Sequence, residues 1–250
     1  MMKLPIAQPP WSGLGKRLES CVRKALFDFN MLETASRLAI AVSGGKDSMS
    51  LLFLLKAIIG RGFPHVDLYA IHITGPYSCG ASIDTNYLHA ICEALEITFI
   101  TRPSTQQRET LACYPCSRER RKLLFEAAKS VGANIIALGH HRDDNAQTLM
   151  LNLFHKGEFA GMLPKITMHN FGITIIRPLI YATEADLNTF AQQYNFARAV
   201  CRCPMGQNSM RKKVNALLHE IQHTFPNIRN NLALASLTYG SEKANTDPGK

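Results

Sequence analysis

Apolar runs alternate with amphipathic stretches along most of the chain. Residues 38–42 (LAIAV) form an apolar run typical of a buried strand, and a glycine turn separates it from an apolar helical stretch that ends at Gly60. The runs VDLYAIHI, ITFI, NIIALG and ITIIRPLI predict further strands. Helices are expected over residues 87–95, 117–130, 145–155, 213–224 and 231–237.

This order of elements predicts an α/β fold, a doubly wound parallel sheet covered on both faces, with a helical C-terminal extension. Thr183 and Asp186 have capping-box spacing and are expected to begin the extension. In such sheets ligands bind beyond the carboxyl ends of the strands. Chemistry is therefore expected directly after LAIAV and directly after NIIALG, and both places carry unusual residues.

The first of these loops has the composition of a phosphate-binding turn. It consists of Ser43, Gly44, Gly45, Lys46, Asp47 and Ser48. Two glycines let the backbone approach a phosphate closely, the lysine supplies a positive charge, and the serines supply hydroxyl donors. It is not a Walker A loop, because Ile40 and Asp47 stand where that motif needs Gly and Ser or Thr.

The second loop is a dense polar cluster that follows NIIALG. It reads Gly139, His140, His141, Arg142, Asp143, Asp144 and continues as NAQT. The two aspartates suit Mg²⁺ binding, ATP positioning or helix capping, and the histidines suit contacts with a nucleotide or RNA. In the predicted sheet this loop faces the same crevice as the first.

The cysteines form two close pairs, Cys113/Cys116 and Cys201/Cys203. The first pair is expected in a loop before a helix that starts SRERRKLL. Four thiolates suit zinc, three suit an iron–sulfur cluster with one open iron, and a C-x-x-C pair also suits redox chemistry; the spacing does not decide. Cys92 lies in a helical stretch and is expected in the core.

Charge and hydropathy set limits on partners and location. The chain has 250 residues with 28 Lys and Arg against 19 Asp and Glu, a net charge of +9, which favours a polyanionic partner. Polar residues interrupt its apolar runs, so neither a signal peptide nor a membrane span is expected. The odd number of cysteines, seven, argues against a disulfide framework and for a reduced cytoplasmic protein.

Motifs in a fixed order resemble a known family. SGGKDS resembles the SGGxDS loop of PP-loop ATP pyrophosphatases, and GHHRDDNAQT resembles their second signature. The run CYPCSRERRKLLFEAAKSVGANIIALGHHRDDNAQTLMLNLF and the stretches GMLPK, IRPLIY and CPMGQNSMRKKV are similar to the tRNA 2-thiocytidine synthetases (TtcA family). The similarity runs from Asp28 to about Tyr239.

The resemblance implies a fold of the adenine nucleotide alpha hydrolase type and a specific reaction. ATP would transfer AMP to the C2 oxygen of a tRNA cytidine at anticodon-loop position 32, and sulfur would replace that oxygen. A [4Fe-4S] cluster would be held by Cys113, Cys116 and Cys203, with Cys201 as the competing third ligand. It also implies Mg²⁺, a cysteine desulfurase or other sulfide source, and a homodimer.

Residue roles follow from the same resemblance. The nucleotide would contact residues 43–48 together with Gly139 and His140. Lys46, Asp47, Asp143 and Asp144 would act in catalysis. Independently of the resemblance, clustered cations are expected to hold the phosphates of the tRNA, namely Arg118, Arg120, Arg121, Lys122, Arg211, Lys212 and Lys213.

The expected division of the chain is an N-terminal basic segment (1–27), a PP-loop ATPase domain with the C-x-x-C loop (28–200), a segment with the third cluster ligand and the last helices (201–240), and a disordered tail (241–250).

Two alternative functions stay open. One is a related tRNA-modifying enzyme that makes 2-thiouridine or lysidine. The other is a zinc-stabilised RNA-binding protein whose nucleotide loop is vestigial.

Overall fold

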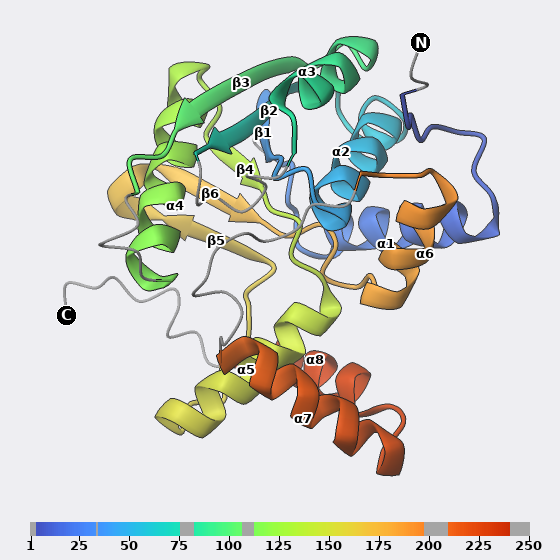
Figure 1. Cartoon of the computed structure of the whole chain (residues 1–250), viewed down its shortest axis with the longest axis vertical. Helices are drawn as coiled ribbons and strands as arrows, with labels where there is room; N and C mark the ends of the chain where they lie inside the picture. The colour runs from blue at the N-terminus through green and yellow to red at the C-terminus, as the bar shows by residue number, and fades with distance from the viewer. Residues whose placement is uncertain (1–3, 34, 76–82, 107–112, 198–209, 241–250) are drawn as a thin grey trace.

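A six-stranded sheet in the order β3-β2-β1-β4-β6-β5 organises the molecule (Figure 1). The computed structural model describes residues 4–33, 35–75, 83–106, 113–197 and 210–240. The strands are β1 (Arg37–Ala41), β2 (Asp67–Thr74), β3 (Thr98–Pro103), β4 (Ile135–Ala137), β5 (Lys165–Met168) and β6 (Ile173–Ile176). The helices are α1 (Gly13–Asp28), α2 (Lys46–Ile58), α3 (Thr85–Ala94), α4 (Cys113–Ser130), α5 (Arg142–Lys156), α6 (Glu184–Gln193), α7 (Met210–Thr224) and α8 (Ile228–Tyr239).

The predicted α/β fold is confirmed, with one antiparallel edge. β1 pairs in parallel with both β2 and β4, and β3 and β6 extend the parallel sheet on either side. β5 pairs antiparallel with β6. The apolar pattern did not predict β5, because its residues Lys165–Met168 are mixed and form no apolar run. A tight connection that ends at Gly172, with φ +57°, returns the chain directly into β6.

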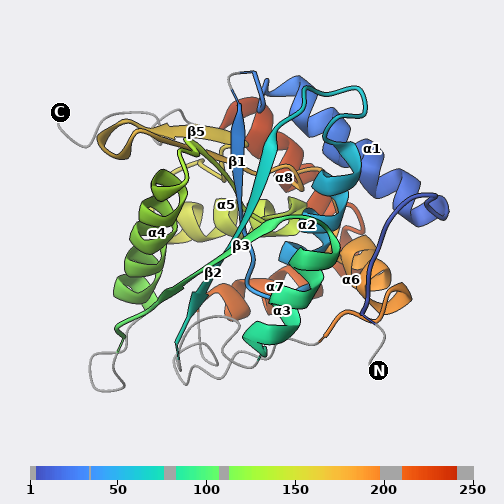
Figure 2. The same ribbon diagram turned by 90° about the horizontal axis from the view of Figure 1, so that it is seen from above.

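Helices cover both faces of the sheet (Figure 2). α1, α2, α3 and α6 pack on one face around a core that contains Leu18, Phe53 and Phe190. α4 packs on the other face through residues that include Phe125 and Ala128. The residues expected as a basic N-terminal segment include α1, whose apolar positions recur every four residues and are buried in the first core.

Two local predictions are corrected. The cysteine pair 113–116 does not lie in a loop, because α4 begins at Cys113. Pro115 is compatible with this start because the first N–H groups of a helix have no intrahelical acceptor. The run 173–180 is a strand only as far as Ile176, since the N–H of Ile180 donates to Arg177 O in a turn that contains Pro178.

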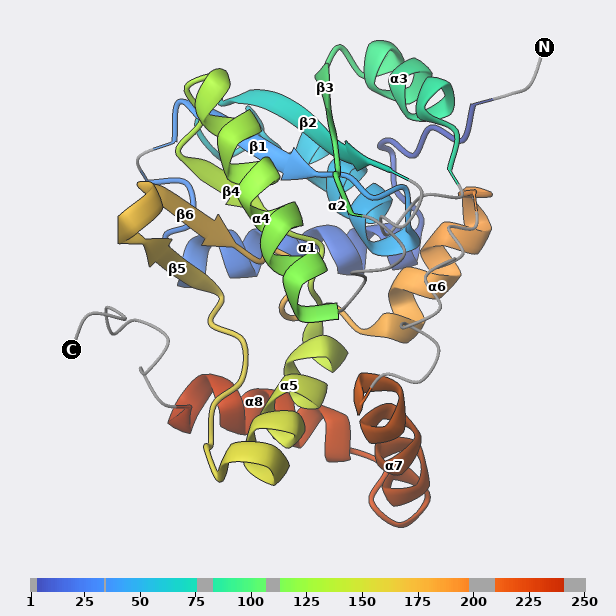
Figure 3. The ribbon, with the colours of Figure 1, turned by 60° about the vertical axis from the view of Figure 1, so that its left-hand side comes forward.

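The predicted helical extension consists of α7 and α8 packed on α5. Figures 1 and 3 show these three helices below the sheet, with α5 leading down from it. Met150, Val214 and Leu218 form a small separate apolar core there. Thr183 caps α6 as predicted, because its side chain accepts a hydrogen bond from Asp186 N. It does not begin the extension, because α6 packs on the sheet in the main core. None of the described helices has the length and apolar character that a bilayer crossing requires.

Candidate functional site

The two polar loops meet where the strand order reverses, between β1 and β4. A cavity of about 420 Å³ opens there at the carboxyl ends of the strands. It is lined by Ala41, Val42, Ser43, Gly45, Asp47, Ser48, Ile71, His72, Ile73, Ser117, Arg120, Arg121, Leu124, Phe125, Ile136, Leu138, Gly139, His140, Asp144 and Arg211. The lining combines apolar side chains with charged ones, which suits a nucleotide with its base and its phosphates.

The first loop leaves the start of α2 free of a side-chain cap. Gly45 is the N-cap residue and makes no side-chain capping bond. Gly44 has φ +79°, and a Cβ there would lie 2.8 Å from the Ile83 side chain, so glycine is required. Ser48 Oγ binds Ser43 Oγ at 3.1 Å and Gly45 O at 3.0 Å, which ties the loop together. The positive end of the α2 dipole therefore faces the cavity, as in anion sites.

Lys46 lies beside the loop between two carboxylates. Its Nζ is 3.0 Å from Asp47 Oδ1 and 3.4 Å from Glu184 Oε1. Burial lowers the pKa of Lys46, but the charges and hydrogen bonds of Asp47 and Glu184 outweigh it and leave that pKa raised. Burial also raises the pKa of Asp47, although the charges of Lys46 and His141 oppose it. Lys46 therefore stays cationic.

The second loop packs directly on the first. A Cβ at Gly139 would lie 3.1 Å from the backbone C of Asp47 and the N of Ser48, so the absence of a side chain allows this approach. His141 caps α5 in a capping box with Asp144, whose carboxylate accepts from His141 N at 3.1 Å. His141 Nε2 lies 3.9 Å from Asp47 Oδ1 and 3.5 Å from Asp144 Oδ2. The carboxylates of Asp47 and Asp144 thus converge on the cavity from two loops.

His140 is held as a neutral side chain in the cavity wall. Arg177 Nε donates to His140 Nδ1 at 3.3 Å. Because a guanidinium only donates, Nδ1 accepts and the ring proton lies on Nε2. Burial lowers the pKa of His140 to about 3, with a further contribution from the charge of Arg177. His140 can therefore offer one N–H donor to a ligand at neutral pH.

Asp143 is buried and does not line the cavity. Its Oδ2 accepts from Glu184 N at 2.8 Å, at the start of α6. Its Oδ1 lies 3.6 Å from Arg142 Nη2 and 3.9 Å from Arg229 Nε. Its expected catalytic role stays a prediction, and its contacts place it where it fixes Glu184, the partner of Lys46.

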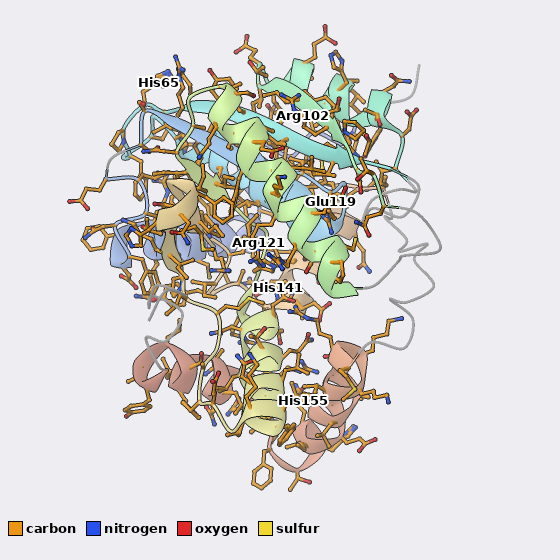
Figure 4. The ribbon with its side chains drawn as sticks, turned by 90° about the vertical axis from the view of Figure 1, so that its left-hand side faces the viewer. His65, Arg102, Glu119, Arg121, His141 and His155 are labelled. Atoms are coloured by element: carbon orange, nitrogen blue, oxygen red, sulfur yellow. The ribbon has the colours of Figure 1, made fainter. Side chains whose placement is uncertain are left out.

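Of the cations expected to meet tRNA, Arg120, Arg121 and Arg211 line the cavity. Figure 4 shows Arg121 projecting from α4 toward the start of α5, where His141 lies. The exposed Arg118 and Lys122 belong to α4, and the exposed Lys212 and Lys213 belong to α7. The two helices border the same opening.

The cysteine prediction is tested only in part. Cys116 is half-buried in the first turn of α4, one residue before Ser117 of the cavity wall. The side chain of Cys113 and all of Cys201 and Cys203 lie outside the described residues. No group of three or more metal-ligating side chains occurs within the described part of the chain. Cys92 is buried as predicted, and burial raises the pKa of its thiol to about 12.

Sequence reasoning missed Glu184 and Arg177. Glu184 follows the Thr183 cap and looks like an ordinary first-turn acid, so only the fold brings it to Lys46. Arg177 belongs to the motif IRPLIY and directly follows an apolar strand. That position, at the carboxyl end of a strand, was the signal that could have identified it as a site residue.

Comparisons with known proteins agree with this geometry. A family model described as a PP-loop domain matches residues 16–199. The tRNA-cytidine(32) 2-sulfurtransferase of Bordetella avium is 37% identical over 221 residues, which cover 85% of this chain and 70% of that protein. The protein of the same name from Geobacter metallireducens is 34% identical and covers 88% of each chain.

The fold also matches a solved structure, the U34-tRNA thiolase NcsA from Methanococcus maripaludis with its [4Fe-4S] cluster. The TM-score is 0.73 at 22% identity, covering 94% of this chain and 85% of that one. At that identity the match shows the fold alone. The family model and the curated relatives go further: this chain belongs to the PP-loop proteins and, among them, to the tRNA-cytidine(32) 2-sulfurtransferase family.

Proposed function

We propose that the chain is an ATP-dependent tRNA sulfurtransferase that replaces the C2 oxygen of a cytidine, at position 32 of the anticodon loop, with sulfur. The observation that carries the proposal is one cavity that brings together an uncapped helix start, two carboxylates and Ser117, the residue of α4 that follows Cys116. The name of the curated relatives supplies the substrate.

The first half of the reaction is adenylation. The C2 oxygen attacks the α-phosphorus of ATP, pyrophosphate leaves, and the oxygen becomes part of a phosphate ester. The amides at the start of α2 and the Lys46 ammonium stabilise the charge that develops on pyrophosphate, since preorganised donors act most strongly in a partly dry site. The neutral His140 donates one hydrogen bond from Nε2.

Asp47 and Asp144 suit a Mg²⁺ ion. Both carboxylates line the cavity and approach the same ring nitrogen of His141, so they lie near one another beside the phosphate loop. Mg²⁺ prefers one or two carboxylates together with phosphate oxygens and water. When bound, it would neutralise phosphate charge, and the carboxylates of Asp47 and Asp144 would hold it.

Cys113, Cys116 and Cys203 suit a [4Fe-4S] cluster. The first two are three residues apart in the first turn of α4, so their Cα atoms share one side of the helix at its positive end, where thiolates are stabilised. The cluster would supply sulfide at an iron that no protein thiolate occupies. The protein's contribution would be to hold the cluster through these thiolates, of which Cys116 directly precedes Ser117 of the cavity wall.

Paired variants test this assignment. Lys46→Ala is expected to slow tRNA-dependent pyrophosphate release on the order of 10²–10³-fold and to leave the iron and sulfide content unchanged. Cys116→Ser is expected to lose iron and the cluster's visible absorption while ATP binding survives. Lys56→Ala, at the far end of α2, is the matched control for Lys46 and should release pyrophosphate normally.

The product identifies the reaction. Mass analysis of tRNA nucleosides after incubation with ATP and sulfide should show 2-thiocytidine. Formation of 2-thiouridine or lysidine instead would assign the chain to a different tRNA modification. One zinc with no acid-labile sulfide in protein purified without oxygen, and no modified nucleoside, would reject the enzyme assignment.

A further inference from the structure

α4 forms part of the wall of the cavity that the first loop also lines. Ser117, Arg120, Arg121, Leu124 and Phe125 of this helix all line the cavity. Arg120 is four residues after Cys116 and therefore lies on the same face of the helix, about 6 Å further along its axis. Its side chain lines the same cavity as Ser43, Gly45 and Asp47 of the first loop.

Arg120 has no anionic partner within the described part of the chain. Its Nε is buried and makes no hydrogen bond. The neighbouring Glu119 is engaged elsewhere, because it accepts from Thr105 N at 2.8 Å and from Ser104 Oγ at 3.2 Å.

The cavity's own carboxylates have other partners. Asp47 pairs with Lys46 at 3.0 Å, and Asp144 lies 3.5 Å from Arg211. Three guanidiniums against two carboxylates leave the lining with excess positive charge. A buried guanidinium nitrogen without a partner is costly unless a ligand satisfies it.

The charge of Arg120 acts inside the cavity. Burial lowers the pKa of the His72 imidazole, and the charge of Arg120 lowers it further, against the opposing effect of the Val42 carbonyl. His72 Nδ1 donates to Val42 O at 2.7 Å, as a neutral ring does. Because His72 is neutral, it neither neutralises nor repels an anion. The positive charge of Arg120 in the cavity is therefore available to an anionic ligand.

We propose that Arg120 binds the α-phosphate of the nucleotide. This inference rests on the proposed function. In the proposed reaction Lys46 and the start of α2 stabilise the departing pyrophosphate, and sulfur arrives from the cysteine end of α4. The α-phosphate is the one that becomes bonded to the C2 oxygen, so in this arrangement it would be the phosphate nearest to α4. It is common to ATP, the adenylated base and AMP.

The contact assists sulfur transfer as well as nucleotide binding. In that step an S–C2 bond forms, the C2–O bond breaks, and its electron pair leaves with AMP as the phosphate dianion. Arg120 offsets the second negative charge that appears on this phosphate. A guanidinium suits the role because it presents several fixed donors to phosphate oxygens.

Binding of ATP, AMP and adenosine, measured by calorimetry, tests the contact. Arg120→Gln is expected to weaken the binding of ATP and of AMP by roughly 10-fold to 100-fold. The affinity for adenosine should not change, since only adenosine lacks the phosphate. Lys129→Gln removes one charge from the far end of the same helix and should change none of the three. Arg120→Lys keeps the charge and should recover part of the AMP affinity.

Equal weakening of all three ligands, or normal AMP binding by Arg120→Gln, would overturn the phosphate contact. Nucleoside analysis separates this failure from failure of the proposed function. If the wild-type protein binds AMP through Arg120 but makes no 2-thiocytidine, the proposed function is wrong and the phosphate contact stands. If the wild-type protein makes 2-thiocytidine but Arg120→Gln binds AMP normally, only the proposed contact is wrong.

Discussion

Single residues in this site are tuned by their surroundings more than by their type. His140 and His141 are adjacent, yet His141 caps α5 near two carboxylates whereas His140 is half-buried and accepts a hydrogen bond from Arg177. Burial, together with the positive charge of Arg177, lowers the pKa of His140 to about 3. A histidine held neutral in this way keeps one N–H donor for a ligand over the whole physiological range.

The pH dependence of stability follows from this pKa. Between pH 6.5 and about pH 3 the unfolded chain binds a proton at residue 140 that the folded chain does not, so the unfolding free energy falls as the pH is lowered. Urea unfolding of wild type and His140→Gln at pH 7.5 and 5 should differ in pH dependence by roughly 2 kcal/mol. His155→Gln, an exposed change at the other end of α5 (Figure 4), should behave as wild type. Equal pH dependence of wild type and His140→Gln would contradict the depressed pKa.

At the scale of elements, α5 links the sheet to the helical extension. It starts in the cavity and continues between α7 and α8, and its Asn145 is fully buried. Asn145 Oδ1 accepts from Met162 N at 2.6 Å and from Ser236 Oγ at 3.2 Å, and Nδ2 donates to Ala233 O at 3.4 Å. One side chain therefore joins α5, α8 and the segment before β5.

Removing this side chain should loosen the junction. Asn145→Ala leaves buried donors and acceptors unpaired and is expected to lower the unfolding free energy by roughly 2–4 kcal/mol. Amide hydrogen exchange should accelerate in α8 before it does in the sheet. Asn231→Ala, an exposed change on α8, is the control and should shift stability by less than about 0.5 kcal/mol. A loss of stability in Asn231→Ala but not in Asn145→Ala would argue against this link. So would an unchanged rate of amide hydrogen exchange in α8 of Asn145→Ala.

At the scale of the whole molecule, basic helices border the cavity opening. α4 contributes Arg118, Arg121 and Lys122, and α7 contributes Arg211, Lys212 and Lys213. Contacts of such cations with phosphates release counterions, so affinity for RNA should fall steeply with salt. The arrangement fits a large substrate that delivers one base to a small cavity.

The slope of log Kd against log salt measures this surface. Lys212→Gln with Lys213→Gln should reduce the slope for tRNA by about 1.4–1.8, since each phosphate contact contributes about 0.7–0.9. Lys16→Gln with Lys24→Gln removes the same charge from α1, across the sheet from α4, and should leave the slope near that of wild type. Identical slopes for the two double variants would show that α7 does not contact the tRNA backbone.

Local sequence signals predicted the strands and helices that carry strong periodicity. The apolar run before SGGKDS and the amphipathic pattern after it were sufficient for β1 and α2, because burial on both faces demands such a pattern. Segments with weaker local signals were predicted wrongly or not at all. β5 has no apolar run, and the C-x-x-C segment looked like a loop because Pro115 is a poor helix residue except in the first turn.

The sequence by itself determined the α/β class, the two loops at the strand ends and the family. These depend on residue order, which a chain keeps whether folded or not. Only the tertiary structure decided which charges meet: Glu184 on Lys46, Arg177 on His140, and Arg120 without an anionic partner among the described residues. Electrostatic and hydrogen-bond energies depend on distance and burial, and no spacing along the chain specifies either for residues far apart in sequence.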